Sequence, residues 1–263
     1  MNQALNPQYV PGHGLLAGKR VVVTASAGAG IGSAAAIKCL EEGAASVMIS
    51  DTHQGRLDTS LAELRERFGD DRVFAKACDV TNEEQVQALL DAAEAVGPID
   101  VMINNAGLGG TASILEMTDD QWNLVLNVTL TGTFRCIRAV GQRMKAAGNG
   151  GVIVNNASVI GWRAQEGQAH YAAAKAGVMA LTRSAAKDLA TEGIRVNAVS
   201  PSLAMHPFLE KVTSAELLTE LKAKEAFNRA AEPWEIANVM VFLASDYSSY
   251  MTGEVISVSS QHA

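Results

Sequence analysis

Short apolar runs rich in β-branched residues alternate along the chain with longer segments of helical periodicity. Such runs, bounded by Gly, Pro, Asn, Asp or Ser, are typical of strands buried on both faces. The predicted strands are residues 19–23, 45–50, 73–78, 100–103, 152–154, 194–199 and 255–258. The predicted helices are residues 33–42, 57–67, 119–147 and 234–245, one that opens with a capping box at Thr81, and one that ends near Thr191. This alternation predicts an α/β fold, a single doubly wound domain with a parallel sheet and helices on both faces.

Two segments fall outside the alternation. Residues 1–18 are polar and punctuated by Pro and Gly, so we expect an N-terminal arm on the surface of the domain formed by residues 19–263. Residues 203–231 are rich in Met, Lys and Glu, and we expect them to form a mobile insertion.

The composition is that of a globular enzyme. The 263 residues can bury a substantial core, and 48% hydrophobic with 19% charged residues excludes wholesale disorder. The net charge is −7, and no cluster of Lys and Arg is longer than a dipeptide. Nucleic acid and anionic membranes are therefore poor candidate partners.

The cysteines, the histidines and the N-terminal residues indicate the compartment and argue against a metal site. Cys39, Cys78 and Cys136 lack metal-ligand spacing and indicate buried thiols in a reducing cytoplasm. The five histidines have no paired spacing, so we expect no metal site. The N-terminus lacks the basic and apolar regions of a signal peptide, and no apolar run approaches the ~20 residues of a membrane span.

The residues that link the first strand to the first helix predict a nucleotide site. Residues 24–32 read Thr-Ala-Ser-Ala-Gly-Ala-Gly-Ile-Gly, and such glycines let backbone amides approach a pyrophosphate at a helix amino end. The strict G-x-G-x-x-G pattern fails because Ser33 stands at its third glycine. Asp51 ends the second strand, where a carboxylate accepts hydrogen bonds from adenine-ribose hydroxyls and repels a 2′-phosphate. A structural turn and a helix-capping Asp are the alternatives.

Tyr171 and Lys175 lie four residues apart in an Ala-rich segment, so on a helix they share a face. Moving a Tyr pKa from ~10 to ~7 takes roughly 4 kcal/mol. One positive charge at ~4 Å supplies about that much at an effective dielectric of about 20. We therefore expect Lys175 to lower the pKa of Tyr171 and make it an acid/base near neutral pH. Taken alone, such a pair is more often a surface feature of an amphipathic helix.

These features together resemble the short-chain dehydrogenase/reductase family, from about residue 17 to residue 259. The motifs that carry the resemblance are the glycine turn, Asp79-Val80, Asn104-Asn105-Ala106-Gly107, Ser158 thirteen residues before Tyr171-x-x-x-Lys175, Asn197 before Ser200-Pro201, and Thr252-Gly253. The resemblance implies a Rossmann-type fold, a nicotinamide cofactor and a homotetramer. Residues 157–165, 200–206 and 257–262 further resemble an actinobacterial steroid-degradation branch that acts on a hydroxylated indene-carboxyl-CoA.

The resemblance also implies roles for site residues. Tyr171 exchanges a proton with the substrate oxygen while hydride moves to or from nicotinamide C4, Lys175 binds the nicotinamide ribose, and Ser158 hydrogen-bonds the same substrate oxygen. Thr129 takes the position of the family's proton-relay Asn, and Asn127 lies on the opposite side of the helix. The expected cofactor contacts are Ser26, Gly28, Gly30, Ile31, Asp51, Asp79, Val80, Asn105, Ala106, Gly107, Tyr171, Lys175, Pro201 and Leu203.

Further departures from the family pattern concern the cofactor and the substrate. The glycine turn is one residue longer than Thr-Gly-x-x-x-Gly-x-Gly, the usual Pro-Gly reads Pro201-Ser202, and the usual Asp-Gly-Gly reads Ser259-Ser260-Gln261. His206 replaces a cofactor-contacting Thr, and it either contacts phosphate or substrate or is a hydrogen-bonded surface residue. Trp162 and Arg163 fall where substrate walls form, although Trp162 also suits the core.

Three functions stay open. The first is an NAD-dependent alcohol dehydrogenase whose small-molecule substrate is a bulky acyl-CoA. The second is a 3-oxoacyl thioester reductase using NADPH, which Asp51 argues against. The third is a regulator that binds NAD without turnover, which an intact Ser158, Tyr171 and Lys175 set argues against. For the first function, the expected acyl contacts are Leu203, Met205, Phe208, Leu209, Leu217, Leu218 and Phe227, and the expected CoA-phosphate contacts are Lys211, Lys222, Lys224 and Arg229. A solvated amphipathic helix is the alternative for this segment.

Overall fold

The computed structural model describes residues 5–205 and 214–261. Within these ranges one sheet of parallel strands has the order β3-β2-β1-β4-β5-β6-β7. The strands are β1 (Arg20–Val23), β2 (Ser46–Ile49), β3 (Val73–Ala75), β4 (Val101–Asn104), β5 (Gly151–Asn156), β6 (Ile194–Pro201) and β7 (Val255–Val258). The order reverses between β1 and β4, and open α/β sheets bind ligands at the carboxyl ends of the strands beside such a point.

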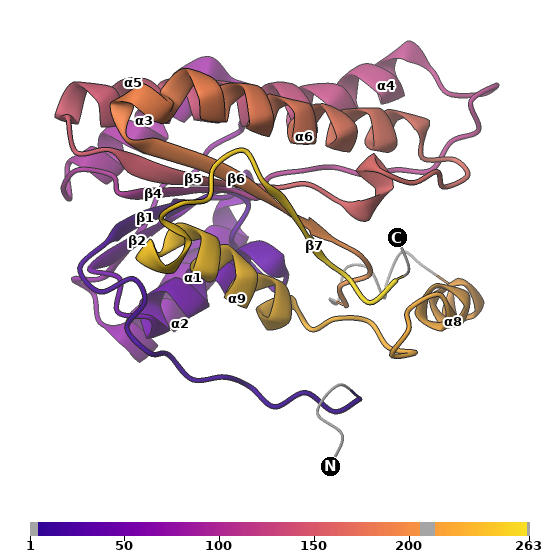
Figure 1. Ribbon diagram of the computed structural model, residues 1–263, viewed down its shortest axis with the longest axis horizontal. Coiled ribbons are helices and arrows are strands. Elements are labelled where there is room, and N and C mark those ends of the chain that lie inside the picture. The colour runs from indigo at the N-terminus through magenta and orange to yellow at the C-terminus, as the bar shows by residue number, and fades with distance from the viewer. Residues whose placement is uncertain (1–4, 206–213, 262–263) are drawn as a thin grey trace.

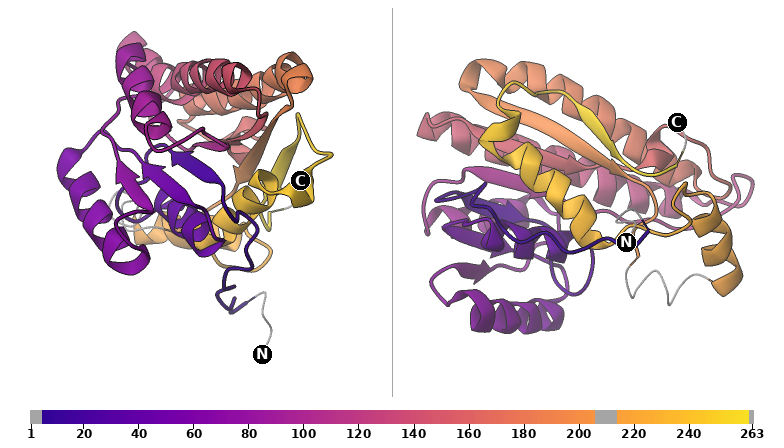
Figure 2. Two further views of the ribbon diagram at one scale, coloured as in Figure 1. Left: turned by 90° about the vertical axis from the view of Figure 1, so that its left-hand side faces the viewer. Right: turned by 60° about the horizontal axis from the view of Figure 1, so that its bottom comes forward.

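Helices cover both faces of the sheet, which confirms the predicted doubly wound fold. Helices α1, α2 and α9 lie on one face, and α3 to α6 lie on the other (Figures 1 and 2). The bounds are α1 (Ile31–Glu41), α2 (Gln54–Phe68), α3 (Glu83–Glu94), α4 (Asp119–Leu126), α5 (Gly132–Ala147), α6 (Ala169–Leu189), α8 (Ala215–Ala223) and α9 (Pro233–Ala244). Among the described residues, no helix is long and apolar enough to cross a membrane.

The apolar strands form two cores, one on each side of the sheet. In β1, the side chains of Val21 and Val23 pack toward α1 and α9, whereas Val22 packs on the opposite face with residues of α3 and α5. Successive strand residues point to opposite faces, so a strand buried on both sides needs an unbroken apolar run. Each fully buried Val or Ile contributes about 1.5–3 kcal/mol relative to an exposed one.

The helices follow the prediction to within a few residues at each end, with two differences that have a structural cause. The predicted helix 119–147 is divided into α4 and α5 by one π-helical turn, Asn127–Thr131. A π turn inserts an extra residue into the helix and rotates the side chains that follow, which apolar periodicity does not show. Helix α3 is capped by Asn82, whose side chain accepts from the Gln85 amide at 3.1 Å, so the predicted cap at Thr81 is wrong by one residue.

The described part of the arm, residues 5–18, contributes to the core as well as to the surface. Leu16 is fully buried within the α1–α9 core, and its amide donates to the Glu42 carbonyl at 2.9 Å. The Tyr9 ring meets the Trp234 ring of α9 edge-on, with centroids 5.3 Å apart. The arm therefore spans two helices that pack on the same face of the sheet.

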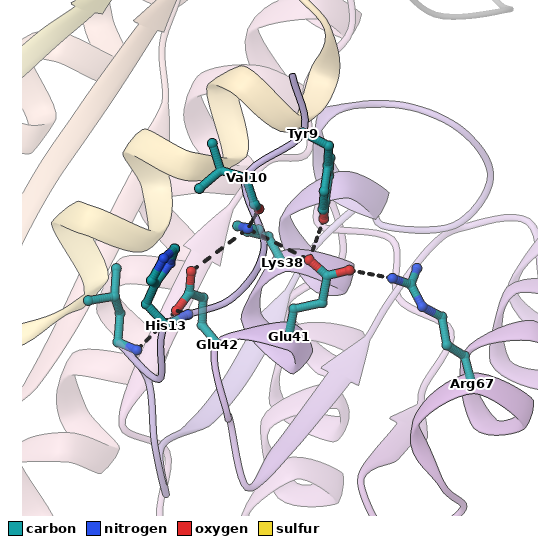
Figure 3. Close-up of polar contacts among 8 residues, drawn as sticks. Tyr9, Val10, His13, Lys38, Glu41, Glu42 and Arg67 are labelled. Carbon is teal, nitrogen blue, oxygen red and sulfur yellow. Dashed lines mark hydrogen bonds and ion pairs between the residues drawn. The ribbon is translucent and has the colours of Figure 1, made fainter. Parts of the chain in front are cut away.

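The buried ammonium group of Lys38, in α1, binds the N-terminal arm (Figure 3). The Nζ of Lys38 lies 3.7 Å from Glu41 and 3.8 Å from Glu42, and it donates to the Val10 carbonyl of the arm. The same Nζ lies over the Tyr9 ring, 4.9 Å from its centroid. Lys38 is 2% exposed, and a buried charge is tolerated only when it is paired in this way.

Replacing Glu42 with Ala should lower the free energy of unfolding by about 3 kcal/mol, because breaking a buried ion pair leaves the other charge uncompensated. Glu42 also accepts from the amides of His13 at 2.7 Å and Leu15 at 3.0 Å. Urea-induced unfolding measures the effect, and Glu63→Ala on the exposed side of α2 is the matched control, expected within about 0.5 kcal/mol of wild type. A Glu42→Ala protein as stable as this control would show that the arm cluster does not hold the fold.

Candidate active site

Ser158, Tyr171 and Lys175 meet at the carboxyl end of β5. Ser158 follows β5 and caps a short 3₁₀ turn, Val159–Gly161, while Tyr171 and Lys175 lie one helical turn apart at the start of α6. The Ser158 side chain acts on the Tyr171 phenol and works to lower its pKa. The Nζ of Lys175 donates to the Asn156 carbonyl at 2.6 Å. The expected trio is therefore assembled.

Burial dominates the ionisation of this trio. Desolvation raises the pKa of the Tyr171 phenol, and the hydrogen bond from Ser158 acts in the lowering direction. Desolvation also lowers the pKa of Lys175 to about 8. The net shift is therefore upward, where the sequence analysis expected a lowered pKa, because burial outweighs the lowering influences. The Lys175 Nζ lies over the face of the ring, 5.6 Å from its centroid, because the Asn156 carbonyl holds it there.

Asparagines tie this trio to the glycine turn. The Asn156 side chain donates to Asn105 Oδ1 at 2.9 Å, and Asn105 Nδ2 donates to the carbonyls of Thr24 and Ala25 at 3.2 and 2.9 Å. The Thr24 hydroxyl in turn accepts from the amides of Asn105 and Ala106 at 3.0 and 3.1 Å. The ends of β1, β4 and β5 are thus connected through side chains. Asn105 was expected at the cofactor, and here its amide group braces the turn that would carry the cofactor.

The glycine turn fits a dinucleotide pyrophosphate. Gly30 is the N-cap of α1 and offers no side-chain acceptor, and no acidic residue lies in the first turn that Ile31 begins. The first helical amides are therefore free to bind an anion, favoured by the helix dipole. A Cβ on Gly32 would lie 2.3 Å from the Ala25 carbonyl oxygen and from Asn105 Nδ2, so only glycine allows this close approach. A side chain on Gly30 would meet nothing within 4 Å, which leaves open space for a ligand.

Two other residues of the turn have structural partners. Ser26 is fully buried, and its hydroxyl donates to the Val23 carbonyl at 2.8 Å and accepts from the Ser50 amide at 3.1 Å. We assign Ser26 to joining β1 and β2, in place of the cofactor contact expected from the sequence. The amide of Gly28, at φ +84°, donates to Ser60 Oγ of α2 at 2.9 Å.

Asp51 makes a turn contact, and its expected contact with the ribose stays a prediction. Its Oδ1 accepts from the His53 amide at 2.9 Å, a turn contact before α2, and from Arg56 Nη2 at 2.9 Å. Its Oδ2 accepts no hydrogen bond from the described residues, so one oxygen remains for ribose hydroxyls. Arg56 is half-exposed, with 55% of its side chain accessible. A cation therefore stands beside the Asp51 carboxylate.

The remaining expected cofactor contacts line the same edge of the sheet. Val80 packs closely against Gly132, the first residue of α5. A Cβ added to Gly132 would lie only 2.6 Å from Val80 Cγ2. Asp79 accepts from the Thr81 amide at 2.8 Å. A Cβ on Gly107 would lie 3.3 Å from Lys175 Nζ, so glycine leaves room for the ammonium. Pro201 ends β6, and Leu203 follows it.

Thr129 lies inside the π turn and is fully buried. Its hydroxyl accepts from the Leu108 amide at 3.0 Å and donates to the Leu108 carbonyl at 3.2 Å. The proton of the hydroxyl and one of its two lone pairs are therefore used in holding the loop after Gly107. Asn127 accepts from Arg135 at 2.9 Å, and so it does not replace the relay residue.

Sequence reasoning missed Thr24, Asn156 and Arg56. Thr24 and Asn156 stand next to motif residues, and their position at the ends of β1 and β5 was the available signal. Arg56 gave no signal, because its pairing with Asp51 depends on the turn between β2 and α2. Trp162 is 51% exposed, which excludes the core as its place. His206, Phe208, Leu209 and Lys211 lie outside the described residues.

A cavity of about 420 Å³ lies at the opposite edge of the sheet, where Lys19, Asp100, Gly151 and Ile194 begin or precede strands. It shares no residue with the trio or with the glycine turn. Among the described residues, no group of three or more His, Cys, Asp or Glu side chains has the placement of a metal site.

Comparison with known proteins agrees with this geometry. A family model described as enoyl-(acyl carrier protein) reductase matches residues 25–260. The chain belongs to the short-chain dehydrogenase/reductase family. As a member, it is an oxidoreductase that acts on hydroxyl and keto groups, and its fold implies a nicotinamide cofactor.

Three relatives show how far the similarity extends. A reductase of (5R,7aS)-5-hydroxy-7a-methyl-1-oxo-2,3,5,6,7,7a-hexahydro-1H-indene-carboxyl-CoA from Mycobacterium tuberculosis is 60% identical over 263 residues, which cover 100% of both chains. A cis-4-hydroxycyclohexanecarboxylate dehydrogenase from Sinomonas cyclohexanicum is 40% identical over 91% of this chain and 95% of the relative. The crystal structure of a short chain dehydrogenase from Mycobacterium smegmatis superposes with a TM-score of 0.88 at 53% identity, with 100% of both chains covered.

The phenol of Tyr171 should ionise only above pH 10, its ordinary value, because burial penalises the phenolate. Ultraviolet difference titration of wild type against Tyr171→Phe isolates this one phenol from the other tyrosines. A phenolate that appears near pH 7 would instead restore the view that Lys175 controls the ionisation.

Proposed function

We propose that this chain is an NAD-dependent oxidoreductase that interconverts a secondary alcohol and a ketone on a bulky alicyclic acyl-CoA. The observation that carries the proposal is the meeting of Ser158, Tyr171 and Lys175 with the glycine turn and Asp51 at one edge of the sheet. The name of the Mycobacterium tuberculosis relative, a reductase of an indene-carboxyl-CoA, supports the substrate class.

In this proposal the residues divide the chemistry between them. A bound nicotinamide supplies or accepts the hydride at its C4 atom. Ser158 and Tyr171 hydrogen-bond the substrate oxygen and so orient the carbon that exchanges hydride. Tyr171 donates its phenolic proton to that oxygen during reduction and takes it back during oxidation. A raised phenol pKa keeps this proton in place at neutral pH.

Lys175 stabilises charge on the Tyr171 phenol from the face of the ring. Its pKa of about 8 leaves it mostly protonated at neutral pH, so it stabilises the phenolate that forms as the proton leaves. The Asn156 carbonyl keeps the ammonium over the ring. We infer that Thr129 serves the site by fixing the loop at Leu108, through one bond that its hydroxyl accepts and one that it donates.

Exposed apolar side chains support a large apolar substrate. Leu108 follows β4, Trp162 follows β5, and Leu217 and Phe227 lie in the segment after β6. Between 37% and 51% of each residue is exposed. All four stand in segments that leave the carboxyl ends of strands, the edge where the trio lies. Apolar groups gathered on one exposed edge are typical of a ligand or partner surface.

Some of the Lys and Arg side chains in the segment after β6 support a CoA thioester as the substrate. Arg229 forms two hydrogen bonds with Glu235, at 2.6 and 2.8 Å, and is therefore committed to α9. Lys224 pairs with Glu220 at 2.8 Å on the exposed side of α8. Lys222 forms no ion pair with the described residues. We therefore assign CoA phosphates to Lys222, with Lys224 as the second contact.

The second candidate is reduction of a 3-oxoacyl thioester with NADPH. Arg56 favours it, because a guanidinium beside Asp51 offers a partner for a 2′-phosphate. A 3-oxoacyl-[acyl-carrier-protein] reductase from Thermotoga maritima is 38% identical over 92% of this chain and 97% of the relative. We prefer NAD because Asp51, 6% exposed, follows β2, where a carboxylate would repel a 2′-phosphate.

We also propose a cytoplasmic homotetramer. Cys39, Cys78 and Cys136 are free and buried, which supports a reducing compartment. Leu124 on α4 and Phe134 on α5 are exposed apolar residues, which supports an interface on that face. Light scattering coupled to size exclusion measures the assembly.

Tyr171→Phe should lower kcat at least 100-fold, because general acid–base catalysis by a positioned group contributes about 10²- to 10⁴-fold. NADH binding and the unfolding midpoint should stay at wild-type values, since Tyr171 belongs to neither of the two apolar cores that flank the sheet. Tyr250→Phe, at a fully exposed tyrosine, is the matched control. Retention of a tenth of the wild-type kcat would remove Tyr171 from the reaction.

Wild type should use NAD with a kcat/KM at least about 100-fold above that for NADP, because the Asp51 carboxylate repels the 2′-phosphate. Asp51→Ala should narrow the gap by raising use of NADP, with Arg56 left to bind the phosphate. Arg56→Ala should not narrow the gap between NAD and NADP. Equal use of both cofactors by wild type would favour the second candidate.

A hydroxy-hydroindane carboxylate should react with NAD far better as its CoA thioester than as the free acid. Each charge-assisted hydrogen bond to phosphate contributes about 1.5–3 kcal/mol, or roughly tenfold or more in kcat/KM. Lys222→Ala should lower kcat/KM for the thioester and leave the free acid unchanged. A free acid that reacts as well as the thioester would refute the CoA assignment.

A further inference from the structure

One buried carboxylate organises the segment between β6 and α9. Glu225 follows α8 and is 3% exposed. Its Oε1 accepts from Gln261 Nε2 at 2.7 Å and from the Leu203 amide at 3.4 Å. Its Oε2 accepts from Ser260, at 2.8 Å from the hydroxyl and 3.3 Å from the amide. All of these partners are neutral donors, and a carboxylate can be buried at tolerable cost only where such bonds satisfy it.

Gln261 extends the contacts of Glu225 to the loop behind Ser158. The Oε1 of Gln261 accepts from Arg163 Nη1, and the amide of Arg163 donates to the Val159 carbonyl at 3.0 Å. Val159 begins the 3₁₀ turn that Ser158 caps. Side-chain hydrogen bonds therefore run from the loop after β5, through the C-terminal tail, to the segment after β6.

Backbone hydrogen bonds strengthen the same junction. The Ala226 amide donates to the Ser260 carbonyl at 2.8 Å, the Ala231 amide donates to Leu203 at 2.8 Å, and the Met205 amide donates to Ala231 at 2.9 Å. Figure 1 shows α8 beside the C-terminal tail and apart from both helical layers. Helix α8 buries none of its residues. Its position thus depends on these end contacts, where the sequence alone predicted a mobile insertion.

We propose that Glu225 is a positioning residue that sets specificity for a large acyl group. It fixes two apolar walls at once, because Phe227 lies two residues beyond it and Trp162 adjoins Arg163. This inference deepens the proposed function and rests on it. The bonds to Glu225 come from Ser260 and Gln261, two of the positions where the chain departs from the family's Asp-Gly-Gly, and glycine has no side chain with which to form them.

Four variants test the proposal. Glu225→Ala removes every acceptor, Glu225→Gln keeps the volume and one acceptor, and Gln261→Ala breaks the connection to Arg163. Glu216→Gln, on the exposed first turn of α8, is the matched control. The measurements are kcat and KM for hydroxy-hydroindane carboxyl-CoA with NAD, and amide hydrogen exchange over residues 200–205 and 224–231.

Glu225→Ala should raise KM at least tenfold with kcat within threefold of wild type, because Glu225 positions the wall and does not touch the reacting atoms. The amides of Ala226 and Ala231 should exchange faster, while those of β5 and α6 keep their protection. Glu225→Gln and Gln261→Ala should raise KM by severalfold, and the control should match wild type. If Glu225→Ala does not fold, these two milder variants decide the same question.

The outcomes separate this inference from the proposed function. A wild-type enzyme inactive on the thioester refutes the proposed function, and hydrogen exchange then decides whether Glu225 positions the segment. A wild-type enzyme active on the thioester, with KM and exchange unchanged in Glu225→Gln and Gln261→Ala, overturns the inference alone. A fall in kcat at unchanged KM would also overturn it, since that is the signature of a catalytic group.

Discussion

The hydrogen bond from Lys175 Nζ to the Asn156 carbonyl is the contact on which the site depends. It joins the start of α6 to the end of β5, and so it sets where the phenol of Tyr171 stands. From Asn156, side-chain bonds continue through Asn105 to Thr24 and the glycine turn. The acid/base and the nucleotide turn are therefore parts of one hydrogen-bonded assembly at the switch point of the sheet. A shift of β5 would move both together.

The sequence was sufficient for the fold and for the expectation that Tyr171 and Lys175 lie side by side, because both are encoded locally. Unbroken apolar runs such as Val21 to Val23 require a strand buried on both faces, and helical spacing alone places Tyr171 beside Lys175. The ionisation of Tyr171 could not be predicted in this way. A pair at helical spacing suggests an ammonium beside a phenol oxygen, whereas burial and the Asn156 carbonyl place the ammonium over the ring.

Several features that the sequence did not reveal involve contacts between distant segments. Thr129, in the π turn, bonds through its hydroxyl to Leu108, twenty-one residues earlier. Glu225 is held by residues at the C-terminus, thirty-five positions away. Local propensity contains no record of such pairs. The same is true of Lys38, which reads as a surface lysine of α1 and is buried because the arm covers it.

The most direct test of the mechanism follows the hydride itself. The substrate is hydroxy-hydroindane carboxyl-CoA that carries deuterium on its carbinol carbon. It is oxidised with NAD, and the mass of the reduced cofactor is measured by mass spectrometry. We expect one deuterium on the nicotinamide ring of each NADH formed, since hydride passes directly between substrate carbon and C4. Unlabelled NADH, or no oxidation of the thioester at all, would contradict the central claim.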